Sequence, residues 1–246
     1  MKHIPIFAHR GASGYALENT LKAFEKAKAL GADGIEIDLQ ISKDAIFVVF
    51  HDLDLKRLVG IRKLVSDCTA EELMKYNLGS RWERIFQRQR MMSFQQLIQW
   101  ATKEKMALNI ELKESILENH DVLRQTMRTI ELPENSHISS FHTSLLKTVK
   151  EVRPDIETAI LVTKKFDWHN VSKQNCFDVI HAHKKYYKPQ YLNCCDEAKI
   201  GIRFYGIKGN ESYLANPHPA VLGWITDYPD KVRKAQKYKV DFNRGV

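Results

Sequence analysis

Acidic side chains at strand-like spacing are the first chemical signal in this sequence. Glu36 and Asp38 alternate with isoleucine in an apolar run, so both carboxylates leave the same face of a strand. Two carboxylates side by side on a buried strand repel each other and resist desolvation. A bound divalent cation is the usual remedy, because hard cations take oxygen ligands. The pair therefore predicts a metal site.

A third carboxylate follows the same pattern further along the chain. In the segment Asn-Ile-Glu111-Leu-Lys113, the acidic and basic residues share one face of a strand and the apolar residues share the other. We therefore expect Glu36, Asp38 and Glu111 to form an all-oxygen site for Mg²⁺, Ca²⁺ or Mn²⁺ rather than for zinc. The alternative is that these carboxylates only form ion pairs with Arg10 and Lys113.

Two histidines occupy positions suited to proton transfer. His9 and His51 each close an apolar strand, and barrel enzymes place their chemistry at that end of the strands. Such a pair can act as general acid and general base around a phosphoryl group, while Arg10 and Lys113 neutralise its non-bridging oxygens. Arg10 would face away from His9 in a regular strand, so this role requires the chain to turn at Gly11. Structural or surface roles are expected for six other histidines: His3, His120, His169, His181, His183 and His218.

Short apolar runs that alternate with helical patterns must position these side chains. Strands alternating with helices imply βαβ units and a parallel sheet. Eight such units in about 250 residues have the size of a closed TIM (β/α)₈ barrel. The alternative, an open doubly wound sheet, lacks a Gly-x-Gly-x-x-Gly turn after its first strand. The runs, with the second counted as one extended strand, are Ile4 to Ala8, Gly34 to Leu39 with Ile46 to Phe50, Ala107 to Leu112, Ile138 to Phe141, Glu157 to Val162, Val179 to Ala182, Ile200 to Tyr205 and Val221 to Thr226.

Helix start and stop signals lie between these strands. Asn19-Thr20 can cap a helix that ends at Gly31. Capping boxes begin at Thr69 and Ser93. Two further helices are predicted, over Ser144 to Val152 and from Pro229 to about Tyr238.

The connection after the second strand is too long for a simple strand-to-helix loop. Residues 52–92 contain a helix of their own and the charged stretch Arg81 to Arg90. We interpret them as a short insertion over the barrel mouth, within one domain that spans residues 1–246. The insertion shows no obvious apolar face for a membrane.

Composition and charge restrict the classes of function. Hydrophobic residues make up 43% of the 246 residues, which can supply a core and argues against a disordered chain. The net charge of +8 favours anionic ligands. The basic residues are spread among acids rather than gathered in a stripe, so a phosphate-bearing small molecule fits better as a partner than nucleic acid does.

The sequence does not predict membrane insertion or export. No run of about 18 apolar residues occurs, so no helix is predicted to span a membrane. The apolar part of the N-terminal segment is too short for a signal peptide. The four cysteines lack Cys-x-x-Cys spacing, which favours reduced thiols. We therefore expect a cytoplasmic protein without stable membrane insertion.

Short motifs that cover the whole chain match the motifs of one enzyme family in the same order. They are His9-Arg10-Gly11, Glu18-Asn19-Thr20, Gly34 to Asp38, Lys43-Asp44, Val49 to Asp52, Asn109 to Lys113, Ser139-Ser140-Phe141 and Thr226-Asp227-Tyr228-Pro229. With these motifs the chain resembles the glycerophosphodiester phosphodiesterase family. The resemblance implies a TIM barrel with a short insertion after the second strand. It further implies metal ligation by the three carboxylates, acid–base catalysis by His9 and His51, and phosphate contacts from Arg10 and Lys113. The implied reaction is hydrolysis of glycerophosphodiesters to sn-glycerol 3-phosphate and an alcohol.

Two segments depart from the family pattern. Leu17 stands where the family often has proline before Glu-Asn-Thr. The seventh strand of the family usually ends in Trp-Thr-Val-Asn, whereas this chain has Phe204-Tyr205-Gly-Ile. Because that aromatic segment helps to line the mouth of the barrel, we expect Phe204 and Tyr205 to affect tolerance for the leaving alcohol and not the phosphate chemistry.

Three other functions compete with this interpretation. A lysophospholipase D, or a related phospholipid-head-group phosphodiesterase, would use the same architecture and is favoured by an amphipathic mouth. A glycosidase would also carry paired carboxylates in a barrel, but it would keep its activity in a chelator. A barrel that only binds glycerophosphodiesters would lack catalytic residues, and none of the expected ones is missing here.

Overall fold

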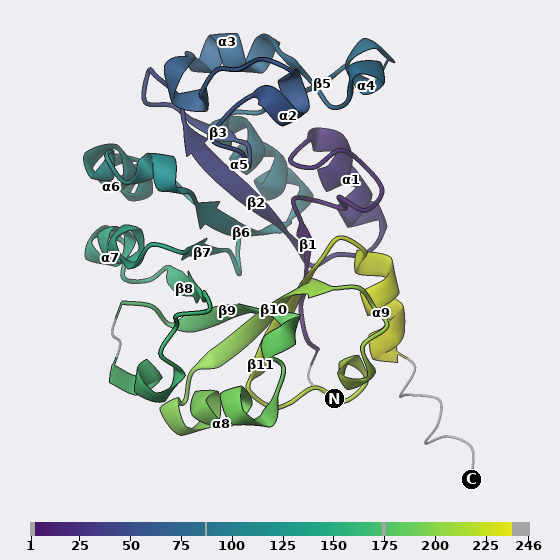
Figure 1. Cartoon of the computed structure of the whole chain (residues 1–246), viewed down its shortest axis with the longest axis vertical. Coiled ribbons are helices and arrows are strands. Elements are labelled where there is room, and N and C mark those ends of the chain that lie inside the picture. Colours follow the sequence, from purple (N-terminus) through teal and green to yellow (C-terminus); the bar gives the residue numbers. More distant parts are fainter. Residues whose placement is uncertain (1–2, 87, 174–175, 238–246) are drawn as a thin grey trace.

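Eight parallel strands close into a barrel with helices outside it (Figure 1). The computed structural model describes residues 3–86, 88–173 and 176–237. The strand β1 pairs with both β2 and β11, which closes the ring and confirms the predicted TIM barrel. The barrel strands are β1 (Ile6–His9), β2 (Gly34–Ile41), β6 (Ala107–Leu112), β7 (His137–Ser140), β8 (Glu157–Leu161), β9 (Val179–His183), β10 (Gly201–Ile207) and β11 (Val221–Thr226).

The helices around the barrel begin where their capping residues predict. Thr20 accepts a hydrogen bond from the backbone of Ala23, and Ser93 and Gln96 form a reciprocal capping box. Helices α6 and α8 are not anticipated by the sequence signals. The outer helices are α1 (Leu21–Ala29), α5 (Phe94–Glu104), α6 (His120–Thr129), α7 (Thr143–Val152), α8 (Pro189–Ala198) and α9 (Pro229–Lys237), with short 3-10 turns η2 (Glu114–Ile116), η3 (Trp168–Lys173), η4 (Lys184–Tyr186) and η5 (Ser212–Leu214).

The predicted insertion follows β2 and covers one side of the barrel, at the top of Figure 1. The second apolar run is not one extended strand as predicted. The chain reverses after Ser42, whose hydroxyl bonds Asp44 and the backbone of Ile46, so β3 pairs antiparallel with β2. The strand β3 (Phe47–Val49) leads into the insertion, whose elements are α2 (Lys56–Val59), η1 (Val65–Asp67), α3 (Ala70–Lys75), β4 (Asn77–Leu78), α4 (Arg81–Phe86) and β5 (Gln89–Arg90).

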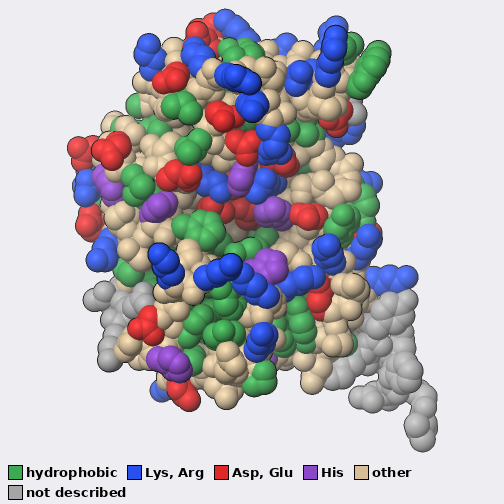
Figure 2. All heavy atoms as spheres, viewed as in Figure 1, with side chains coloured by type: hydrophobic (Ala, Val, Ile, Leu, Met, Phe, Trp, Pro, Cys, Tyr) green, Lys and Arg blue, Asp and Glu red, His purple; other side chains and the backbone are tan. Residues whose placement is uncertain are grey.

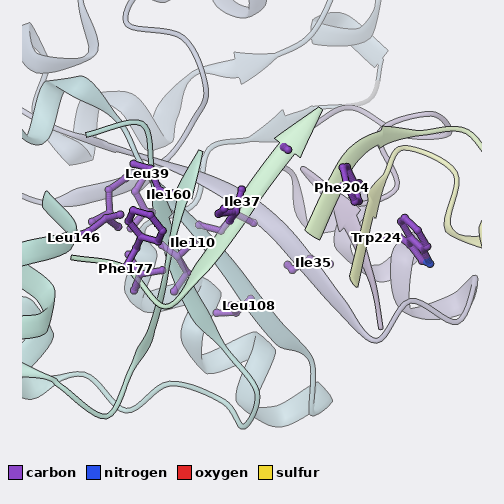
Figure 3. Packing of buried hydrophobic residues seen from close by; sticks show 14 of the residues in the cluster. Ile35, Ile37, Leu39, Leu108, Ile110, Leu146, Ile160, Phe177, Phe204 and Trp224 are labelled. Carbon is purple, nitrogen blue, oxygen red and sulfur yellow. The ribbon is translucent and has the colours of Figure 1, made fainter. Parts of the chain in front are cut away.

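Strand alternation separates the core from the polar interior of the barrel mouth. Ile35, Ile37 and Leu39 are fully buried between β2 and the outer helices, and Leu108 and Ile110 continue this layer on β6 (Figure 3). Each such side chain contributes roughly 1.5–3 kcal/mol by its burial. This apolar layer therefore fixes which face of β2 and β6 turns inward, and the inward face carries the acidic residues.

The described residues contain no helix that is both long enough and apolar enough to cross a bilayer. The four cysteines, Cys68, Cys176, Cys194 and Cys195, are all free thiols. The domain boundaries predicted at 1 and 246 fall on residues 1–2 and 238–246, which lie outside the described residues.

Candidate active site

Strand register brings the three predicted carboxylates together inside the barrel mouth. Asp38 on β2 lies opposite Glu111 on β6, and Glu36 lies opposite His9 on β1. Glu36, Asp38 and Glu111 are each less than a tenth exposed. Each offers an oxygen within 4.8 Å of the others, which is close enough for one divalent cation to contact all three.

Basic residues partly neutralise this acidic group. The Nζ atom of Lys113 lies 2.9 Å from Asp38 and 2.6 Å from Glu111. Asp38 also pairs with Nε of Arg10 at 3.2 Å. Glu36, by contrast, accepts a hydrogen bond from the backbone N–H of Arg10 at 2.9 Å and has no ion pair among the described residues. The ion-pair alternative therefore describes Asp38 and Glu111 but leaves Glu36 without a cation.

The pKa values follow this uneven pairing. Burial raises the pKa of Glu36, and the charge of Asp38 raises it further. Burial and Asp38 also raise the pKa of Glu111, to about 7. Burial would raise the pKa of Asp38 too, but the charges of Lys113 and Arg10 lower it to about 2. Three carboxylates facing two cations leave an excess of negative charge in a buried site, which fits a bound cation.

His9 is held by a carboxylate that directly follows β11, the last strand of the barrel. Its Nδ1 lies 2.7 Å from Asp227, which also accepts a hydrogen bond of 2.8 Å from the hydroxyl of Ser13. Burial lowers the pKa of His9, but the hydrogen bond to Asp227 and the charge of Glu36 outweigh it, and the pKa is raised above 6.5. Because Nδ1 is engaged, Nε2 is the ring nitrogen left for proton transfer.

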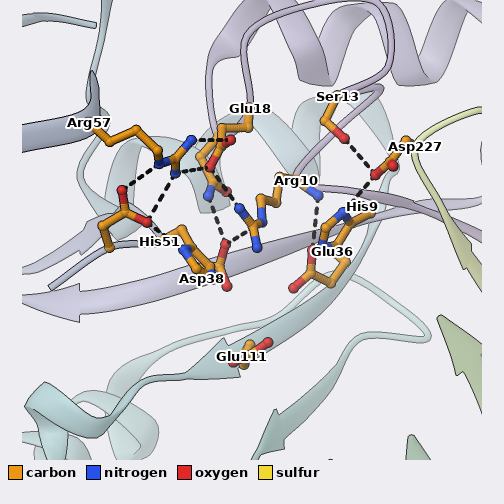
Figure 4. Close-up of polar contacts among 12 residues, drawn as sticks. His9, Arg10, Ser13, Glu18, Glu36, Asp38, His51, Arg57, Glu111 and Asp227 are labelled. Atoms are coloured by element: carbon orange, nitrogen blue, oxygen red, sulfur yellow. Dashed lines mark hydrogen bonds and ion pairs between the residues drawn. The ribbon is translucent and has the colours of Figure 1, made fainter. Parts of the chain in front are cut away.

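His51 has a matching partner on the other side of the acidic group (Figure 4). Its Nδ1 lies 2.7 Å from Asp52, whose other oxygen pairs with Nε of Arg57 at 2.6 Å. Arg57 also forms two hydrogen bonds to Glu18, at 2.7 and 2.8 Å. Glu18 in turn accepts one of 2.8 Å from Arg10. This chain of ion pairs connects the insertion to the loop after β1 and fixes the ring of His51.

The turn predicted after His9 is present and gives Arg10 its position. Arg10 and Gly11 both have positive φ, 53° and 79°. A Cβ atom at Gly11 would lie 2.7 Å from Ala23, so only glycine fits there. The turn brings the Arg10 side chain to Asp38 and its backbone N–H to Glu36.

These groups face a cavity of about 170 Å³ at the barrel mouth. Acidic, basic and histidine side chains gather near the centre of this face in Figure 2. Phe141 and Tyr205 supply aromatic surface to the cavity. The cavity is lined by His9, Arg10, Glu36, His51, Asn109, Glu111, Lys113, Ser139, Phe141, Leu161, His181, Tyr205 and Ile225.

Phe204 does not line the mouth, contrary to expectation. Adjacent residues of a strand point to opposite faces. Tyr205 therefore faces the cavity, while Phe204 is fully buried outside the barrel and packs against Tyr187 and Trp224. Of the two predicted aromatic residues, only Tyr205 can contact a substrate.

His181 is a cavity residue for which the sequence indicated only a structural or surface role. Its side chain is fully buried, and neither ring nitrogen has a hydrogen-bond partner among the described residues. Burial lowers the pKa of His181 well below 6.5, so the ring is neutral. Its ring packs edge-on against His137.

Asp227, Asp52 and Glu18 belong to the motifs described above, but no role is predicted for them from the sequence. Asp227 and Asp52 lie just after β11 and β3, and Glu18 lies in the longer loop after β1. That position is a usable signal, because loop carboxylates there can reach the histidines that close the strands. Arg57 carries no such signal, because its partners lie on two separate loops.

Comparison with known proteins gives matches over most of the chain. A family model described as the glycerophosphoryl diester phosphodiesterase family matches residues 9–231. A glycerophosphodiester phosphodiesterase of Caldanaerobacter subterraneus is 28% identical over 241 residues, which cover 96% of this chain and 91% of that protein. The structure of an Oleispira antarctica phosphodiesterase in complex with the product sn-glycerol-3-phosphate has a TM-score of 0.78 and 27% identity, covering 94% of this chain and 96% of that one. A human lysophospholipase D is 28% identical over 174 residues, 66% of this chain and 52% of that protein.

Proposed function

Since the chain belongs to the glycerophosphoryl diester phosphodiesterase family and is a phosphoric diester hydrolase, we propose that it hydrolyses glycerophosphodiesters to sn-glycerol 3-phosphate and an alcohol with the help of a divalent metal ion. One observation carries the proposal. Two histidines, each held through Nδ1 by its own carboxylate, line one cavity beside a cluster of three buried carboxylates, of which Glu36 and Glu111 also line it. This arrangement provides two proton-transfer groups around one place for a metal-bound phosphate.

Glu36, Asp38 and Glu111 would hold the metal ion. The excess negative charge of the group and the unpaired Glu36 support this assignment, and all-oxygen ligands favour Mg²⁺, Ca²⁺ or Mn²⁺. When bound, such an ion would act as a Lewis acid on a phosphoryl oxygen and offset the charge that develops there.

His9 and His51 would divide the two proton transfers. One Nε2 accepts a proton from the attacking group, either water or the 2-hydroxyl of the glycerol, as the new P–O bond forms, and the other donates a proton to the leaving alkoxide as the old P–O bond breaks. Attack by the 2-hydroxyl would give a cyclic phosphate, which water then opens to sn-glycerol 3-phosphate. Asp227 and Asp52 hold each ring in the tautomer that leaves Nε2 free and stabilise its protonated form.

Arg10 and Lys113 would bind the phosphate. Both line the cavity, and both already sit among the acidic side chains, so each can reach a phosphoryl oxygen next to the metal position. Burial would lower the pKa of Lys113, but the charges of Asp38 and Glu111 raise it, so its ammonium remains charged at neutral pH. Tyr205 and Phe141 would contact the alcohol side of the substrate.

Replacing Asp227 with asparagine should shift the pH dependence of the reaction. Asparagine keeps the shape but cannot carry the charge that raises the pKa of His9, and burial would then lower that pKa. The limb of the pH–rate profile that reports His9 should move to lower pH, and kcat should fall by about 10²-fold or more. Ser13→Ala is the matched control, because it removes a hydrogen bond to Asp227 and leaves the charge in place. If this limb of the pH–rate profile lies at the same pH in Asp227→Asn as in the wild type, His9 is not the group that it reports.

The substrate class can be tested by comparing soluble and lipid diesters. We expect the head-group alcohol, choline or ethanolamine, to be released from glycerophosphocholine or glycerophosphoethanolamine faster than choline is released from lysophosphatidylcholine, because the cavity is small and its lining is rich in charged and polar groups. Bis(p-nitrophenyl) phosphate, which has no glycerol, should be a poor substrate. If lysophosphatidylcholine is hydrolysed far faster than every soluble diester, a lysophospholipase D function replaces the one proposed here.

A lysophospholipase D is the second candidate function. The similarity to a human lysophospholipase D supports it, although that match covers a smaller share of both chains. The same metal, histidine and phosphate groups would serve this reaction. The two candidates differ only in the glycerol substituent, which the substrate comparison resolves. We also propose a cytoplasmic location, which the four free thiols support.

A further inference from the structure

Exposed apolar side chains are concentrated on the insertion. Ten large hydrophobic side chains are exposed among the described residues, and six of them fall within residues 52–92, a sixth of the chain. The three on α4 include the two most exposed, Trp82 at 72% and Phe86 at 75%. Such clustering differs from the scattered exposure that is normal on a protein surface. The insertion therefore has an apolar face that the sequence did not lead us to expect.

Helix α4 presents these side chains on one face. Trp82 and Phe86 are four residues apart, and their rings stack with centroids 6.2 Å apart. Ile85 lies beside them and is 56% exposed. No residue of α4 is buried, so packing against the protein does not hold this helix. Its apolar face is free to contact another phase or molecule.

Polar contacts behind this face fix the position of α4. Ser80 and Glu83 exchange backbone and side-chain hydrogen bonds at the start of the helix, at 2.7 and 3.3 Å. Arg84 donates to the carbonyl oxygens of Gly79 and Leu58. Glu83, the only acidic residue in the sequence of α4, thereby caps the helix, and Arg84 anchors it to the neighbouring backbone.

The charges around the apolar face are basic. Residues 81–90 contain four arginines and one glutamate. Arg81 is the first residue of α4 and Arg88 follows the end of the helix; both are exposed and form no ion pair with any described residue. Figure 2 shows Lys and Arg side chains beside hydrophobic ones at the upper right edge, where Figure 1 places α4.

We propose that α4, with Trp82, Phe86 and the flanking Arg81 and Arg88, is a docking surface for an anionic phospholipid bilayer. Aromatic rings partition into the interface of a bilayer, and arginines are attracted to anionic head groups. A second copy of the chain fits less well, because a symmetric contact would bring the arginines of both copies together and would bury only a few side chains. This docking goes beyond the reaction proposed above and does not depend on it.

Vesicle binding by the full chain tests the proposal. Protein is mixed with vesicles of phosphatidylcholine alone or with about 30 mol % phosphatidylglycerol, and bound protein is measured by co-sedimentation. We expect binding to the anionic vesicles that weakens at high salt. Trp82→Ala/Phe86→Ala and Arg81→Gln/Arg88→Gln should each reduce it at least about tenfold, while release of glycerol 3-phosphate from a soluble diester stays unchanged. Ile46→Ala and Arg128→Gln, which remove exposed residues of the same types outside α4, should bind like the wild type.

Tryptophan fluorescence adds a position-specific readout. Of the four tryptophans, Trp82 is exposed, Trp100 is half-buried against Phe24, and Trp168 and Trp224 are buried, so a blue shift on vesicle binding should come from Trp82. Trp82→Phe should keep most of the binding and lose the shift. The proposal is overturned if the wild type ignores anionic vesicles at low salt, or if Trp82→Ala/Phe86→Ala binds equally well. Self-association without lipid that this double variant abolishes would also overturn it, in favour of a second copy as the occupant.

Discussion

Glu36→Gln should reduce kcat by about 100-fold or more and sharply weaken binding of the divalent cation. The substitution removes one charge with little change in shape, and Glu36 is the carboxylate without an ion pair in the described site. Calorimetric titration with Mg²⁺, Ca²⁺ and Mn²⁺ measures the affinity, and release of glycerol 3-phosphate measures the rate. Glu25→Gln makes the same chemical change on an exposed helix position and should leave both unchanged.

Thermal unfolding in a chelator separates loss of function from loss of fold. A carboxyl group whose pKa is raised on folding favours the folded state when protonated and opposes it when ionised, so ionised Glu36 destabilises the metal-free protein at neutral pH. Glutamine removes that repulsion. The variant should therefore unfold at the same or a higher temperature than the chelated wild type. A variant that retains wild-type metal affinity would remove Glu36 from the ligand set.

His9→Ala and His51→Ala should each lower kcat by ~10²–10⁴ while the protein stays folded, because each residue would supply one proton transfer. Steady-state rates with glycerophosphocholine measure the effect, and circular dichroism checks the fold. His169→Ala is the matched control, since His169 is an exposed histidine away from the cavity. A folded single variant with the wild-type kcat would exclude that histidine from the mechanism.

An activated substrate assigns the two histidine roles. With p-nitrophenol as the leaving alcohol of a glycerophosphodiester, the departing anion is stable and needs no proton. The variant that lacks the general acid should recover much of its rate on this substrate, and the variant that lacks the general base should not. Recovery by both variants, or by neither, would contradict the division of roles between His9 and His51.

Most of the fold could be predicted because local patterns determine it. Short apolar runs located every barrel strand to within a few residues, and capping residues located α1, α3 and α5. The second run was misjudged, because the reversal between β2 and β3 depends on hydrogen bonds of the Ser42 side chain rather than on apolar spacing. Helices α6 and α8 begin without a side-chain capping bond, and their single start signals, Asn119 and Pro189, are not part of a capping box.

In the candidate site, too, the residues set by local patterns could be predicted and those set by long-range contacts could not. Glu36, Asp38 and Glu111 could be grouped from the sequence, since alternation sets their face and barrel order sets their neighbours. The partner of His9 could not, because Asp227 is 218 residues away and meets it only when the barrel closes. Resemblance to a family segment does not indicate which of two adjacent strand residues faces the cavity, so the inward position of Tyr205 and the outward position of Phe204 require the structure. The apolar face of α4 has no clear sequence signal, because its three exposed side chains are interleaved with charged residues.

A metal ion held by the three carboxylates is expected to be required for hydrolysis of a glycerophosphodiester. The most direct test measures release of glycerol 3-phosphate from glycerophosphocholine by the wild-type protein, first in excess chelator and then after adding back Mg²⁺, Ca²⁺ or Mn²⁺ singly. We predict that the chelated protein is inactive and that at least one of these ions restores the rate. Full release of glycerol 3-phosphate in the presence of the chelator would contradict it.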